Sequence, residues 1–156
     1  MTNPTHVTAE AGLPFVDIVR EFEHPIDVVF RAHTDQDLFS QWTGPAQLAM
    51  EIVHFDAVTG GSWSYISRDP AGGEYRFRGV FHTVEENALI IQTFEFGGAP
   101  RQVSTSTATF EDLDGRTRIA THTVFPTLQS RDGMVATGME YGINEGYTRL
   151  EQVLAK

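Results

Sequence analysis

Cysteine is absent from the 156 residues of the sequence, and lysine occurs only once, at Lys156. The lack of cysteine excludes disulfides, thiolate metal sites and cysteine nucleophiles, and it fits a reducing, cytoplasmic environment. No apolar run approaches the roughly 18–20 residues that a membrane-spanning helix needs, so no membrane partner is expected. Basic residues are few and scattered, and the formal net charge is −10. This charge argues against a nucleic-acid partner, because binding a polyanion relies on basic patches.

Length and composition predict one globular domain. A chain of this length with 40% apolar and 21% charged residues is large enough to bury a core of its own. Residues 1–14 have neither the basic region nor the apolar segment of a signal peptide. They are therefore expected to form a flexible leader ahead of a single domain over residues 15–156.

The segment from Arg131 to Leu154 has the pattern of one long amphipathic helix, because its apolar residues recur at intervals of three and four. Gly138, Gly142 and Gly146 lie four residues apart and form a second line along that helix. Each glycine inside a helix costs about 0.8–1 kcal/mol relative to alanine. The row therefore predicts a close approach that leaves no room for a Cβ atom. The candidates are a curved sheet, a bound ligand or a partner helix in a homodimer.

Most of the remaining chain is predicted to form strands. Phe15 to Glu23 alternates as a first strand, and Pro25 and Asp35 then mark the starts of two short helices. Six more strands, separated by Gly-, Pro- and Asp-rich turns, are expected at residues 48–53, 62–67, 74–84, 88–96, 101–110 and 116–125. Gly79 lies inside the third of these six, where it is expected to let the strand bend or bulge. The order predicts an α+β fold in which a bent antiparallel sheet of about seven strands wraps around the C-terminal helix.

Several short motifs add a family resemblance to this order of elements. They are Trp42 with Gly44-Pro45, the run Asp-Ala-Val-Thr-Gly-Gly at 56–61, the segments 77–81 and 117–119, and residues 138–142 with Arg149-Leu150. With them the sequence resembles the helix-grip, START-like (SRPBCC) superfamily, in the branch related to the activator of heat-shock protein 90 ATPase. It is most similar to the small bacterial stand-alone members. The resemblance implies a cavity between the helix and the concave face of the sheet, where relatives commonly hold hydrophobic or aromatic small molecules.

The aromatic content suits such a cavity, with eleven Phe, four Tyr and two Trp residues. The candidate ligand-binding residues are Trp63, Tyr65, Phe77, Phe94, Met134 and Met139, together with Gly138 and Gly142 of the helix. The alternative is that the large side chains simply fill the core. Residues 101–110 carry five hydroxyl side chains, so this strand either lines a partly polar cavity or lies near a sheet edge.

Two histidines complete the list of candidate ligand-binding residues. His54 shares strand parity with Met50 and Ile52, so its side chain is expected to point inward, and His122 lies in a later strand. A histidine inside a pocket can act as an acid or base near neutral pH, whereas one at a strand end contacts water or backbone. An enzyme would need inward polar groups, for which the candidates are His54, His122, Tyr65 and Glu95.

No motif with the spacing of a metal site, a nucleophile elbow or a phosphate-binding loop occurs, so no catalytic residue, metal ligand or cofactor is assigned. Binding of a hydrophobic or aromatic small molecule is the favoured function. A cyclase-, aromatase- or hydrolase-like enzyme using the same cavity is the alternative. Chaperone ATPase activation is a third reading, although the eukaryotic activators carry an additional N-terminal domain and only residues 1–14 precede the first expected strand here.

Overall fold

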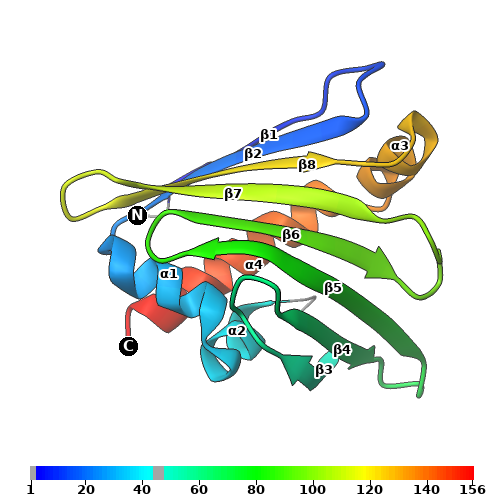
Figure 1. Cartoon of the computed structure of the whole chain (residues 1–156), viewed down its shortest axis with the longest axis horizontal. Coiled ribbons are helices and arrows are strands. Elements are labelled where there is room, and N and C mark those ends of the chain that lie inside the picture. Colours follow the sequence, from blue (N-terminus) through cyan, green and yellow to red (C-terminus); the bar gives the residue numbers. More distant parts are fainter. Residues whose placement is uncertain (1–2, 44–47) are drawn as a thin grey trace.

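The computed structural model describes residues 3–43 and 48–156. Within these residues eight strands form one antiparallel sheet in the order β1-β2-β8-β7-β6-β5-β4-β3 (Figure 1). The strands are β1 Thr5–Thr8, β2 Phe15–Phe22, β3 Ala49–Phe55, β4 Ser62–Arg68, β5 Glu74–Glu85, β6 Leu89–Phe96, β7 Ser104–Asp112 and β8 Thr117–Val124. The helices of the described residues are α1 Ile26–Thr34, α2 Gln36–Trp42, α3 Leu128–Ala136 and α4 Met139–Leu154.

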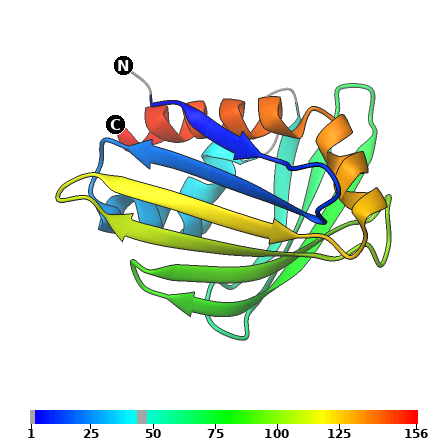
Figure 2. The same cartoon turned by 90° about the horizontal axis from the view of Figure 1, so that it is seen from above.

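The sheet is curved, and α1, α2 and α4 lie on its concave side (Figures 1 and 2). This arrangement confirms the predicted α+β helix-grip fold. The strand count is higher than expected because Thr5–Thr8 forms β1, which pairs antiparallel with β2 from Thr5 opposite Arg20 to Thr8 opposite Asp17. The expected flexible leader over residues 1–14 is therefore corrected at Thr5–Thr8, which belongs to the sheet.

The two short helices follow β2 as predicted. The side chain of Asp35 caps α2, since its carboxylate accepts a hydrogen bond of 3.1 Å from the backbone N–H of Leu38. Trp42 ends α2, and its indole Nε1 donates a hydrogen bond of 2.9 Å to the carbonyl of Ala32 in α1. This bond fixes the two helices together. The Gly44-Pro45 motif expected to close α2 lies outside the described residues.

The expected single helix over Arg131–Leu154 is instead two helices, α3 and α4. Gly138 separates them with a φ of +86°, in the left-handed region that residues with a Cβ rarely adopt. The first glycine of the row therefore marks the break between the two helices rather than a site of close approach. At this break the chain changes direction, so that α3 turns away from the axis of α4 and covers one end of the sheet (Figure 2).

The other two glycines of the row lie inside α4. A Cβ atom added at Gly142 would meet nothing within 4 Å, and one at Gly146 would lie 3.5 Å from the carbonyl oxygen of Trp42, an ordinary van der Waals contact. The expectation that the whole row marks a close approach is therefore wrong. Alanine can fit at both helical positions.

Replacing Gly142 with alanine should raise the free energy of unfolding by about 0.5–1 kcal/mol, because alanine restricts the unfolded chain and meets no neighbour in α4. Gly138→Ala should instead lower it by about 1–2 kcal/mol, because its φ is unfavourable for any residue with a Cβ. Urea denaturation of both variants measures the difference. A destabilising Gly142→Ala would mean that something covers this face of α4 in solution.

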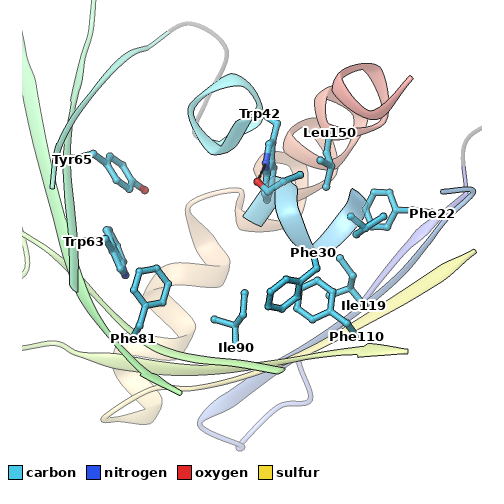
Figure 3. Packing of buried hydrophobic residues seen from close by; sticks show 12 residues of the cluster. Phe22, Phe30, Trp42, Trp63, Tyr65, Phe81, Ile90, Phe110, Ile119 and Leu150 are labelled. Carbon is cyan, nitrogen blue, oxygen red and sulfur yellow. Dashed lines mark hydrogen bonds between the residues drawn. The ribbon is translucent and has the colours of Figure 1, made fainter. Parts of the chain in front are cut away.

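The core fills the concave side where α1, α2 and α4 meet the sheet (Figure 3). Phe30 of α1 packs edge-on against Phe110 of β7 at 4.9 Å between ring centres. Tyr147 of α4 packs in the same way on Phe22 of β2 at 5.3 Å. Leu150 of α4 is fully buried in this cluster. This end of the sheet is therefore occupied by the protein's own side chains.

Candidate functional site

A pocket of about 520 Å³ lies at the other end of the sheet, between α3 and the neighbouring ends of β6, β7 and β8. Its apolar walls are Phe94 and Phe96 of β6, Phe125 just after β8, and Met134 of α3. Ser104 at the start of β7 adds a hydroxyl, and the remaining lining residues are Ala99, Gln102, Thr127, Gln129, Ser130, Gly133 and Thr137. The volume and the mixture of apolar walls with a few polar groups are typical of a small-molecule site.

Local interactions hold α3 over the pocket. Thr127 caps the helix, with its hydroxyl accepting a hydrogen bond of 3.0 Å from the backbone N–H of Ser130, while the Ser130 hydroxyl accepts one of 3.3 Å from the backbone N–H of Thr127. Arg131 points the other way and is only 4% exposed. Its guanidinium donates a hydrogen bond of 3.0 Å to the carbonyl of Glu10, which ties α3 to the connection between β1 and β2.

An aromatic wall continues from the pocket across the concave face of the sheet. Phe96 stacks on Phe77 of β5 at 5.1 Å, and Phe94 lies 5.6 Å from the same ring. Phe77 in turn lies 5.1 Å from Tyr65 of β4. Tyr65 stacks on Trp63 at 5.3 Å with an interplanar angle of 19°. Alternate residues of three neighbouring strands therefore give one continuous aromatic surface.

Gly79 of β5 lies directly opposite Trp63 in the sheet. A Cβ atom at this position would lie 2.6 Å from the Trp63 ring atoms Cε2 and Cζ2, and 2.0 Å from the carbonyl oxygen of Thr93. The glycine thus lets the indole lie against the backbone of β5. The irregularity expected at Gly79 occurs two residues later, where the pairing of β5 with β6 shifts between Phe81 and Thr83.

Two polar groups belong to this wall. The indole Nε1 of Trp63 is buried without a hydrogen-bond partner in the structure of residues 3–43 and 48–156. Burial raises the pKa of the Tyr65 hydroxyl, so this group stays protonated and able to donate. Both side chains extend from β4 toward the interior of the domain (Figure 3).

The structure brings together most of the apolar candidates from the sequence. Phe94 and Met134 line the pocket itself, and Trp63, Tyr65 and Phe77 form the adjoining aromatic wall. Met139 packs nearby in a smaller cluster with Val16, Ile18 and Phe125. Gly138 and Gly142 are exposed and do not line the pocket.

The two histidine candidates lie apart from the pocket. The pairing of β3 with β4 shifts between Ile52 and His54, so His54 is exposed and the expectation that it points inward is wrong. His122 lies on the outer face of the sheet. Its Nδ1 is 2.6 Å from a carboxylate oxygen of Asp17, and its ring packs on Phe15 at 4.8 Å.

Glu95 also faces outward, because it alternates with the inward-facing Phe94 and Phe96 of β6. Its carboxylate accepts hydrogen bonds of 2.6 Å from the backbone N–H of Arg101 and of 2.6 Å from the guanidinium of Arg78. These two bonds, the first above all, lower the pKa of Glu95. Of the four polar candidates for an enzyme, Tyr65 alone belongs to the inner wall.

Sequence reasoning missed two of the aromatic residues that line the pocket, Phe96 and Phe125. Phe96 continues the parity of Phe94, so strand alternation alone was sufficient to find it. The hydroxyl-rich strand β7 lies between β6 and β8, so its placement near a sheet edge is wrong. Ser104 on its inner face lines the pocket, as the other reading of that strand proposed.

The described residues contain no group of three or more His, Asp or Glu residues arranged to hold a metal ion. None of the helices in residues 3–43 and 48–156 combines the length and apolar character required to cross a membrane.

A curved antiparallel sheet that holds helices against its concave face, with a pocket at one end, defines a helix-grip domain of the START type. The family model described as Activator of Hsp90 ATPase homolog 1-like protein matches residues 23–155, and the chain belongs to this family. Comparison with curated proteins gave no match.

Solved structures of similar proteins agree with the fold. A protein from Rhodobacter sphaeroides has a TM-score of 0.89 at 19% identity, covering 97% of this chain and 99% of its own. A protein from Arthrobacter aurescens has a TM-score of 0.86 at 23% identity, covering 96% of this chain and 91% of its own. A third, from Staphylococcus epidermidis, has a TM-score of 0.83 at 26% identity and covers 95% of this chain and 93% of its own.

Proposed function

We propose that the protein binds a hydrophobic or aromatic small molecule in the pocket beneath α3. The observation that carries this proposal is the contrast between the two ends of the concave face. At one end, Phe30, Phe110 and Leu150 fill the space with the protein's own side chains. At the other, a pocket of about 520 Å³ is walled by aromatic rings and a methionine. Such walls bury an apolar ligand favourably and adapt to its shape.

Binding is a better match to the geometry than catalysis. Acid–base chemistry needs a titratable group within hydrogen-bonding reach of the reacting atoms. His54, His122 and Glu95 all face away from the pocket, and the carboxylate of Glu95 is already held by two hydrogen bonds. A carrier or sensor of an apolar molecule requires only a pocket with apolar walls.

A leucine at position 133 should block the pocket without harming the fold. Gly133 of α3 lines the pocket, and a Cβ atom added there would meet nothing within 4 Å. Leucine also favours a helix over glycine by roughly 0.8 kcal/mol, so Gly133→Leu should melt no lower than the wild type. The variant should nevertheless lose the stabilisation that a ligand gives.

Thermal melts with a panel of flavonoids, polyketides, fatty acids and steroids measure this effect. A ligand at a hundred times its dissociation constant adds about 2.7 kcal/mol, which raises the midpoint of the wild type by several degrees. Gly142→Leu is the matched control, since it makes the same change in α4, away from the pocket lining. The control should keep the full shift. An undiminished shift in Gly133→Leu, or no shift of the wild type with any compound, would contradict the proposal.

A further inference from the structure

The two tryptophans of the chain differ in how their indole N–H groups are used. Trp42 donates its N–H to the carbonyl of Ala32 at 2.9 Å. Trp63 is only 6% exposed, and its N–H has no acceptor within the part of the chain that the structure describes. Buried tryptophans usually find such a partner, and most buried polar groups in native proteins are hydrogen-bonded. The unpaired donor of Trp63 therefore calls for an explanation.

The indole of Trp63 is held in place on both sides. One side lies against the backbone of β5 at Gly79, where a Cβ atom would come within 2.6 Å of ring atoms Cε2 and Cζ2. Tyr65 stacks beside it at 5.3 Å. The glycine thus keeps the ring, and with it the N–H, in a fixed position on the inner wall. The protein thus fixes the N–H of Trp63 but supplies no acceptor for it among the described residues. Such a donor is suited to bind an acceptor atom of a ligand.

Phe94 connects this donor to the pocket. Its side chain lines the pocket, and its ring centre lies 6.0 Å from that of Trp63. A ligand that enters beneath α3 and turns the Phe94 ring aside comes into contact with the indole. Tyr65 packs beside Trp63 and Phe77 packs beside Phe94, so aromatic rings continue the wall next to that contact.

The chemistry of the site selects the acceptor. An indole N–H can only donate, so the ligand must present an acceptor atom at its inner end. Among the described residues no arginine or lysine lines the pocket, and the chain carries a formal charge of −10, so a carboxylate or phosphate would be buried without a counterion. A neutral carbonyl oxygen satisfies the donor without that cost. The stacked aromatic wall favours a flat ring system around it.

We propose that Trp63 is the polar anchor of the pocket, and that its indole N–H donates a hydrogen bond to the carbonyl oxygen of a flat, neutral aromatic ketone. This inference rests on the proposed function and narrows the ligand to one chemical class. It also makes Phe94 the side chain that a ligand must displace to reach the anchor.

Xanthone and xanthene test the inference, because they share one tricyclic skeleton and only xanthone has the carbonyl. Xanthone should bind about tenfold more tightly, which is the effect of satisfying one buried donor. In the ¹H–¹⁵N spectrum of the intact protein, xanthone should move the indole N–H signal of Trp63 downfield and leave that of Trp42 nearly unchanged. Trp63→Phe removes the N–H but keeps an aromatic ring, so it should bind both compounds within about twofold of each other.

The free protein provides a control for a purely structural role. Trp63→Phe removes an unpaired donor, whereas Trp42→Phe removes a made hydrogen bond, so the second variant should be the less stable. Xanthone and xanthene binding with equal affinity, with an unmoved Trp63 signal, would overturn the inference and leave the proposed function standing. If neither compound bound the wild type, the inference would be wrong, whereas the proposed function would be contradicted only if the whole panel of ligands also failed to shift the thermal midpoint.

Discussion

Replacing Glu151 with glutamine should lower the free energy of unfolding by about 3 kcal/mol, because it leaves a buried positive charge without its counterion. Arg20 lies on the concave face of β2 with its side chain only 1% exposed, and its Nη2 is 3.7 Å from a carboxylate oxygen of Glu151 in α4. The guanidinium carbon lies 5.2 Å from the ring centre of Phe22. Burial lowers the pKa of Arg20, whereas Glu151 and, to a smaller extent, Tyr147 raise it, so the carboxylate is the main group that offsets the burial of the charge.

Urea denaturation at neutral pH measures the loss. Glu111→Gln is the matched control, because it makes the same change in the exposed ion pair that Glu111 forms with Arg118 at 2.8 Å. Exposed pairs contribute little, so the control should lose far less stability. The double variant Arg20→Met/Glu151→Gln removes both charges and should recover much of the loss. Equal losses in Glu111→Gln and Glu151→Gln would show that the burial of Arg20 does not increase the contribution of its ion pair with Glu151 to the free energy of unfolding.

Local patterns in the sequence predicted the order of elements from β2 to β8 correctly. Alternation located the strands from β2 to β8, and the cap at Asp35 is made by the side chain expected to make it. These features depend on neighbours in the chain, which a sequence displays directly. β1 was missed because a four-residue edge strand has too short a pattern to distinguish it from a leader.

The prediction of which side chains point inward, made from strand alternation, was wrong in β3, where the register of pairing shifts. The slip between Ile52 and His54 shifts the facing of every later residue in β3, so Phe55 rather than His54 packs inward and contacts Phe81 at 5.8 Å. No glycine or proline marks this position in the sequence. The bulge follows from how β3 pairs with β4, and that pairing is not encoded within one strand.

The prediction of a single long C-terminal helix was wrong for a different reason. A repeat of three and four residues continues across Gly138, and such a repeat reports which face is apolar but not the backbone angle at each residue. Glycine just beyond a helix is also a common stop signal. Three glycines at equal spacing were compatible both with one continuous helix and with a helix that ends at Gly138. The φ of +86° at Gly138 shows that the helix ends there.

The site was partly predictable for the same physical reasons. Phe94 and Trp63 share the inward parity of regular strands, so their placement on the inner wall followed from alternation. The rest of the pocket lining comes from connections, as at Gln102 and Thr127, and from α3. Their positions depend on how distant segments meet, which has no local signature.

Acidification from pH 7 to pH 4 should destabilise the protein by about 3 kcal/mol through His33 alone. The ring of His33 in α1 packs edge-on against Trp42 at 4.9 Å and Phe110 at 5.2 Å. Its Nδ1 lies 2.8 Å from the carbonyl oxygen of Val29, to which the neutral ring donates. Burial lowers the pKa of His33 from 6.5 to about 4, and the bond to Val29 opposes this only in part.

The sign follows from proton binding. Between pH 6.5 and about 4 the unfolded chain binds a proton at His33 that the folded protein does not, so falling pH favours unfolding. The contribution is complete above pH 6.5, is lost progressively as the pH falls, and is fully lost just below pH 4. At about 1.4 kcal/mol per pKa unit, the shift from 6.5 to about 4 corresponds to about 3.5 kcal/mol, of which about 3 kcal/mol is lost by pH 4 because the folded-state ring is then half protonated.

His33→Leu keeps an apolar side chain between Trp42 and Phe110 and removes the titrating group. Its free energy of unfolding, measured by urea denaturation at a series of pH values, should therefore fall less steeply below pH 6.5 than that of the wild type. Acid also protonates carboxylates such as Glu21, whose pKa is lowered by hydrogen bonds from Arg118 and Arg116. Those groups are present in both proteins, so the difference between the two pH profiles isolates His33. Parallel pH profiles of the two proteins would mean that the folded protein accommodates the protonated His33 ring, and that the packing around α1 opens readily in acid.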